Sequence, residues 1–189
     1  MRPLDKFNRL QKQWIEFKNN PKNKKTRIRD AAKELNASEA EILSTEIGEK
    51  VFYLKINDYN LFFKDLLNID KLMTLIRTDY VVHELTIETS KINFKNNSLM
   101  HLNNNLNILT FNTDFFQYAF FEKKMHAGKE LKSFQFFDME GNALIKIYLK
   151  GLKTDEFDKI GKQYKCDYNY ELQNNDIFNS INSTQPHNS

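Results

Sequence analysis

The spacing of the apolar residues changes about one third of the way along this chain. In residues 4–19 they recur at intervals of three and four, which is the period of one face of an α-helix. From residue 72 onwards apolar and polar residues alternate, which is the period of a strand with one buried face. A chain with helical periods first and strand periods afterwards is predicted to have an α+β fold.

Three helices are expected before the sheet. The first, 4–19, is stopped by Asn-Asn-Pro, and the second covers 26–35. Ser38 and Glu41 have the spacing of a capping box, which opens a third helix that runs to about residue 47. A later helix is expected at 154–165, because Thr-Asp-Glu begins it.

The segments that alternate are joined by short links, which is typical of an antiparallel meander of five to seven strands. Candidate strands lie at 50–56, 72–77, 80–88, 91–94, 107–111, 115–123, 131–138 and 143–150. Thr78-Asp79 is interpreted as the turn of a short hairpin, and residues 61–67 as helical or turn-like.

The length of 189 residues indicates one domain, 1–170, with a helical start at 4–47 and a sheet at 50–150. Residues 171–189 are polar and poor in core residues, so a disordered tail is predicted there. No apolar run is long enough for a membrane span, and no secretory signal is visible. The single cysteine, Cys166, cannot form an internal disulfide, which favours the cytoplasm.

The net charge of +3 is too small to indicate nucleic-acid binding by itself. Residues 26–43 do resemble a helix-turn-helix, with Lys22, Lys24, Lys25, Arg27 and Arg29 as a basic approach. Two carboxylates at the start of the second helix would be repelled by phosphate, so no nucleic-acid partner is predicted. Phosphate loops, zinc-ligand spacings and nucleophile elbows are also lacking in the sequence.

His83 is the most informative single residue. Alternation places it on the same face of its predicted strand as Val81, Leu85 and Ile87. One interpretation is a core histidine that bonds to a backbone carbonyl. The other is an axial ligand of haem iron, which needs a neutral imidazole beside an apolar slot. The residues alone leave both interpretations open.

Three segments resemble the bacterial haemin-degrading and haem-utilisation family of the HemS/ChuX type. They read Arg29-Asp30-x-Ala32-x-x-Leu35-x-x-Ser38-Glu39-Ala40-Glu41, Asp79-Tyr80-Val81-Val82-His83-Glu84, and Ser133-Phe134-Gln135-Phe136-Phe137-Asp138-x-x-Gly141-Asn142-Ala143-Leu144-x-Lys146-x-Tyr148. They occur in the order found in the family and cover roughly residues 10–150. The third segment is the most specific.

The resemblance implies one half of a saddle built from two similar halves, more like the N-terminal half, completed by a homodimer or by a missing second half. It implies cytoplasmic binding of haem b (iron protoporphyrin IX) in haem uptake, with a haem transporter or a reductase as a further partner and no insertion into a membrane. His83 is then the metal ligand. Arg77 and Lys146 are candidates for the propionates, and Gln135 and Phe137 for further contacts with haem.

Several alternatives stay open beside haem binding. One alternative is that the chain is a haem-degrading oxygenase. Another is that it is a half-domain that has lost haem binding and serves as a dimerisation scaffold. Arg77 and Lys146 are otherwise part of a solvated sheet face, and Phe134, Phe136 and Phe137 part of the core. The resemblance also places an arginine where this chain has Leu109.

Overall fold

The computed structural model describes residues 3–89, 92–94, 99–104 and 107–166. The helices are α1 (Pro3–Asn19), η1 (Pro21–Asn23), α2 (Ile28–Glu34), α3 (Glu39–Ser44), α4 (Tyr59–Leu66), η3 (Thr113–Phe115) and α5 (Thr154–Gln163). The strands are β1 (Val51–Tyr53), β2 (Lys71–Arg77), β3 (Val82–Glu88), β4 (Ile92–Phe94), β5 (Leu99–Asn104), β6 (Asn107–Asn112), β7 (Tyr118–His126), β8 (Lys129–Phe137) and β9 (Ala143–Leu149). The predicted α+β class is confirmed.

The strands form two antiparallel sheets. The larger has the order β1-β7-β8-β9-β2-β3, and its six strands fall within the predicted five to seven. The second has the order β4-β5-β6 and was not anticipated. The larger sheet is not a simple meander, since β2 pairs with β9 and β1 with β7. These two pairings join segments that are distant in the sequence.

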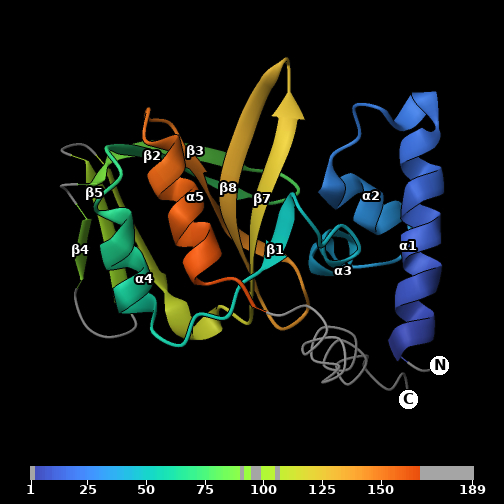
Figure 1. Ribbon diagram of the computed structural model, residues 1–189, viewed down its shortest axis with the longest axis horizontal. Helices are drawn as coiled ribbons and strands as arrows, with labels where there is room; N and C mark the ends of the chain where they lie inside the picture. Colours follow the sequence, from blue (N-terminus) through green and yellow to red (C-terminus); the bar gives the residue numbers. More distant parts are fainter. Residues whose placement is uncertain (1–2, 90–91, 95–98, 105–106, 167–189) are drawn as a thin grey trace.

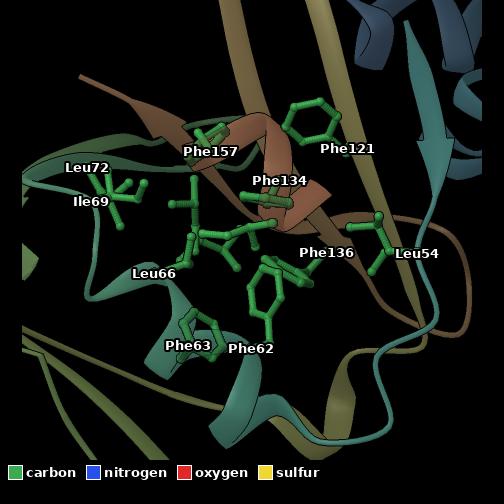
Figure 2. Packing of buried hydrophobic residues seen from close by; sticks show 14 of the residues in the cluster. Leu54, Phe62, Phe63, Leu66, Ile69, Leu72, Phe121, Phe134, Phe136 and Phe157 are labelled. Atoms are coloured by element: carbon green, nitrogen blue, oxygen red, sulfur yellow. The ribbon is translucent and has the colours of Figure 1, made fainter. Parts of the chain in front are cut away.

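Helices lie on both sides of the larger sheet. Figure 1 shows α4 and α5 in front of it, while α1, α2 and α3 gather at the end where β1 lies. The face under α4 and α5 holds the main core cluster, in which Phe62, Phe134 and Phe157 are fully buried (Figure 2). A second cluster joins the first three helices to the other face through Tyr118, Phe120 and Phe137. The many phenylalanines of the sequence therefore fill both layers.

The link between α2 and α3 follows its local sequence. Asn36 has a φ of 51°, a left-handed conformation that asparagine tolerates. Ser38 accepts a hydrogen bond from the Glu41 amide at 3.1 Å, and the Glu41 carboxylate accepts one from the Ser38 amide at 2.8 Å. The predicted capping box is confirmed. The Ala40 amide then donates to the Gly141 carbonyl, which joins α3 to the β8–β9 turn.

Several boundaries differ from the predictions. β5 was missed, because no strand was predicted between 94 and 107. The β2–β3 turn is longer than Thr78-Asp79, because the Thr78 amide donates to the Val81 carbonyl. The predicted tail, 171–189, lies outside the described residues. Within the part that is described, no helix has both the length and the apolar character needed to cross a bilayer.

Candidate functional site

The far end of the β2–β3 hairpin carries an exposed apolar turn, which we define as residues 80–82. Tyr80 is 96% exposed, Val81 59% and Val82 51%. The Thr78 hydroxyl accepts hydrogen bonds from the amides of Tyr80 and Val81, and so holds the turn's backbone. Large apolar side chains in such a position usually contact a partner or a ligand.

His83 follows this turn directly. The predicted alternation is confirmed further along β3, because Leu85 and Ile87 are buried. His83 itself is exposed, as is Val82 on the opposite face, so neither face of β3 is covered at this point. The reason is that β3 is an edge strand whose start extends beyond the core. The core interpretation of His83 is therefore wrong, and in the described residues nothing hydrogen-bonds its ring.

Three of the other candidate residues share the opposite face of the sheet. Gln135 pairs with Lys146, and Lys146 with Leu75 on β2. Arg77 lies two residues beyond Leu75 and therefore on the same face, whereas His83 pairs with Ile76. We call the part of this face that helices α1–α3 do not cover the open face. The structure thus brings Arg77, Gln135 and Lys146 onto one face and His83 onto the other.

Lys146 is tied to the helical cluster. Its ammonium lies 3.4 Å from a carboxylate oxygen of Glu39 on α3, and only 16% of its side chain is exposed. Burial lowers the pKa of Lys146, although the charges of Glu39 and Glu122 oppose this shift. The alternative of a solvated sheet face is therefore wrong for Lys146. An anionic ligand would have to compete with Glu39 for it.

Gln135 belongs to a buried polar network behind Lys146. Its amide nitrogen donates to Glu122 at 2.6 Å and to the Ser133 hydroxyl at 3.1 Å, and the residue is 1% exposed. Its amide oxygen has no hydrogen-bond partner among the residues that the structure describes. Gln135 therefore holds Glu122 in place, and it offers no exposed surface to a ligand.

The phenylalanines of the third motif are core residues. Phe137 is fully buried and packs edge-on against Phe120, in the cluster under α1–α3. Phe134 and Phe136 are fully buried in the cluster on the other side. The structure corrects the expectation that Phe137 contacts haem directly, because its ring has no exposed surface.

Arg77 differs from Lys146 in being available. It is half-buried, and its guanidinium forms no ion pair within the described ranges. Arg77 and Tyr148 lie on the same face of the sheet, and the positive charge of Arg77 opposes the rise in the pKa of Tyr148 that burial causes. The backbone carbonyl of Arg77 accepts a hydrogen bond from Arg29, which also pairs with Asp79 at 3.1 Å. Tyr148 and Arg29 both belong to the motifs, but neither this role of Arg29 nor the burial of Tyr148 was predicted.

Tyr148 predicts how stability depends on alkaline pH. Burial, reinforced by the charge of Glu122, raises its pKa to about 12, so the folded state keeps this proton longer than the unfolded state. The contribution to stability is complete below about pH 10 and is lost as the pH rises from about 10 to about 12. Tyr148→Phe should therefore reduce the fall in the free energy of unfolding above pH 10, measured by urea titration. Tyr80→Phe, at a 96% exposed position, is the matched control and should leave that slope unchanged.

Within the described residues, no metal cluster lies beside His83. The described residues contain no group of three or more His, Cys, Asp or Glu side chains that could hold a metal ion. A cavity of about 800 Å³ lies elsewhere, between the start of β1 and the end of α5, and is lined by residues that include Phe52, Lys162 and Cys166. His83 itself is exposed, together with its neighbours Val82 and Glu84.

Comparison with known proteins gives one family and a consistent fold. Residues 36–164 match the model of the haemin-degrading HemS.ChuX domain. No curated protein matches the chain in sequence. Three similar solved structures are holo-PhuS, described as a heme-binding protein from Pseudomonas aeruginosa, the heme-degrading enzyme ChuS from Escherichia coli O157:H7, and ChuX.

The similarity to these structures is one of fold. PhuS is 20% identical with a TM-score of 0.74, and the match covers 88% of this chain and 46% of PhuS. ChuS is 23% identical with a TM-score of 0.74, and the match covers 88% of this chain and 49% of ChuS. ChuX is 14% identical with a TM-score of 0.61, and the match covers 88% of this chain and 97% of ChuX. The chain thus spans about half the length of PhuS and ChuS.

Proposed function

The chain belongs to the haemin-degrading HemS.ChuX family, and from this premise we propose that it binds haem b in the cytoplasm and carries it during haem uptake and iron utilisation. The iron ligand in this proposal is His83. The observation that carries it is an exposed imidazole with no hydrogen-bond partner in the described residues, next to the exposed apolar turn. A neutral imidazole with a free nitrogen is the commonest protein ligand for haem iron, and apolar surface suits the porphyrin.

Arg77 is the cation proposed for a haem propionate. It forms no ion pair with a described residue, and it pairs across the hairpin with Val82, next to His83 in β3. A guanidinium binds a carboxylate through two parallel hydrogen bonds. Because β3 is an edge strand, a ligand at its edge can reach side chains of both faces. Lys146 is a second candidate, which first has to leave Glu39.

We also propose that this half of a saddle is completed by a second copy of the chain or by a second half. Two facts support the proposal. The chain spans about half of PhuS and ChuS, and His83 is exposed near the start of an edge strand. A haem transporter or a reductase is the further partner that this function requires.

Haemin titration tests the role of His83. Wild-type protein should give a Soret band typical of histidine-ligated haem, and His83→Ala should shift that band and weaken binding at least tenfold. His126→Ala is the matched control, since His126 is also exposed at the end of a strand, and it should behave as wild type. Size-exclusion chromatography of the same samples reports whether a second copy takes part.

Three results would change the proposal. An unchanged spectrum in His83→Ala removes this residue from the iron. If wild-type protein shows no saturable binding of haemin but forms a tight dimer, the chain belongs to the scaffold class. Loss of the Soret band with release of iron, when haem-loaded protein receives a reductant under air, assigns it to the haem-degrading class.

A further inference from the structure

A strongly cationic segment, residues 17–29, lies in the link between α1 and α2. It holds six of the 28 lysines and arginines and none of the 25 aspartates and glutamates, so the rest of the chain carries a net charge of −3. Segregation of charge on this scale indicates an interaction surface rather than a solvated face.

The cations at the two ends of this segment are used internally. Lys18 pairs with Glu46, and Arg29 pairs with Asp79. The four between them are exposed and form no ion pair with any described residue. They are Lys22, Lys24, Lys25 and Arg27.

Local hydrogen bonds hold the backbone that carries these four cations. Asn20 caps the short η1 helix by accepting from the Lys22 amide at 3.1 Å. The Asn23 side chain donates to the Phe17 carbonyl, and the Thr26 amide donates to the Asn23 carbonyl. A fixed arrangement of charges loses less conformational entropy when it meets a partner than a mobile one does.

Arg29 and Lys33 connect this segment to the exposed apolar turn. Both form ion pairs with Asp79, the residue that precedes Tyr80. Figure 1 accordingly shows the β2–β3 hairpin ending beside α2. Cations at the rim of an apolar patch are the composition of a protein–protein interface.

We propose that the cationic segment and the apolar turn together form a docking surface for a protein with an acidic surface, which exchanges haem at the adjacent His83. The inference rests on the proposed haem binding and adds the surface and the charge of the partner. Long-range attraction between opposite charges speeds the encounter, and the apolar turn contributes contact area once the partner has docked.

The observations favour an acidic protein over nucleic acid or membrane. All six residues of α3 are buried, so the second helix of the predicted helix-turn-helix cannot enter a groove. Asp30 and Glu34 are exposed on α2, within the same surface, and would repel the phosphates of DNA or of anionic lipid. A protein partner can place its own cations opposite these two carboxylates.

The test compares two variants that lose the same charge at different places. The neutralised variant carries K22Q, K24Q, K25Q and R27Q. The control variant replaces four other exposed cations that lack ion pairs in the described part of the chain, through K64Q, K129Q, K150Q and K159Q. The donor is haemin-loaded serum albumin, whose surface is acidic, beside the same albumin with amidated carboxylates. Transfer is a ligand exchange at iron with no change of oxidation state.

The neutralised variant should receive haemin from native albumin at least about fivefold more slowly at low salt, where charges are weakly screened. The control variant should change by less than about twofold, and added salt should slow wild type but not the neutralised variant. With amidated albumin as the donor, wild type, the neutralised variant and the control variant should receive haemin at the same rate. Tyr80→Ser should slow transfer without changing the dependence on salt, because Tyr80 is uncharged.

Equal transfer rates in the neutralised and control variants would overturn the docking surface, provided that all three proteins bind free haemin alike. Failure of wild type to bind free haemin would instead overturn the proposed function. In that case docking is measured as the association of haem-free albumin with the wild type and with each variant. Only the neutralised variant should lose this association. Wild type and the control variant could instead bind a 20-base-pair DNA duplex, or vesicles of phosphatidylcholine and phosphatidylserine, while the neutralised variant does not. That result would overturn the protein partner and show that the cationic segment binds phosphate groups.

Discussion

Gly141→Ala should destabilise the fold by about 3 kcal/mol or more, which is a large part of the stability of a small domain. Gly141 has a φ of 80°, where a Cβ alone costs roughly 1 kcal/mol. That Cβ would also lie 2.7 Å from the Cβ of Ser38 and closer still to its hydroxyl oxygen. Ser38 would have to move, which disrupts the capping box of α3 and adds about 2 kcal/mol.

Gly128→Ala is the matched control for this prediction. Gly128 has a φ of 77°, but a Cβ there meets nothing within 4 Å, so only the conformational cost of about 1 kcal/mol remains. Urea unfolding of both variants gives the difference. Ser38→Gly should recover part of the loss when it is combined with Gly141→Ala. Equal destabilisation by the two glycine substitutions would contradict the close approach of α3 to the β8–β9 turn.

Phe136→Ala should cost about 3–5 kcal/mol, the range for truncation of a buried phenylalanine. The ring is fully buried, and it stacks on Phe116 with a centroid distance of 4.7 Å. It also meets the rings of Tyr59, Phe62 and Phe63 at 5.7–6.1 Å, and so links β8 to α4. A cavity at this point would remove one ring contact from each of these four residues.

The measurement is chemical denaturation of Phe136→Ala beside Phe115→Ala. Phe115 is 68% exposed in the segment that leads into β7, and its truncation should change the free energy of unfolding by less than about 0.5 kcal/mol. Phe136→Leu keeps most of the buried volume and should lose clearly less than the alanine variant. A cost for Phe136→Ala similar to that of Phe115→Ala would contradict its central place in the core.

The local features of the fold were predictable from the sequence. The helices, the capping box of Ser38 and Glu41 and the left-handed turn at Asn36 depend on residues within four positions of one another. The alternation in β3 correctly placed Leu85 and Ile87 in the core. β5 was missed because asparagines occupy two of its six positions and the local pattern resembles a loop.

The candidate site was predictable only as a set of residues. The motifs included His83, Gln135 and Lys146, and Arg77 lies two residues before the second motif. The exposure of these residues depends on which element covers which strand. Gln135 and Phe137 lie in β8, which is covered from both sides, whereas His83 lies in an edge strand. Alternation states which residues share a face, and it does not state which face is covered or how far along the strand the cover extends.

The sequence by itself determined the periods, the caps, the turns and the concentration of charge in residues 17–29, because each of these is a property of neighbouring residues. Only the tertiary structure decided the strand order, the burial of Lys146 against Glu39 and the exposure of His83. These depend on contacts between segments distant in the chain, whose free energy comes from surface that both partners bury together. No window of sequence contains both sides of such a contact.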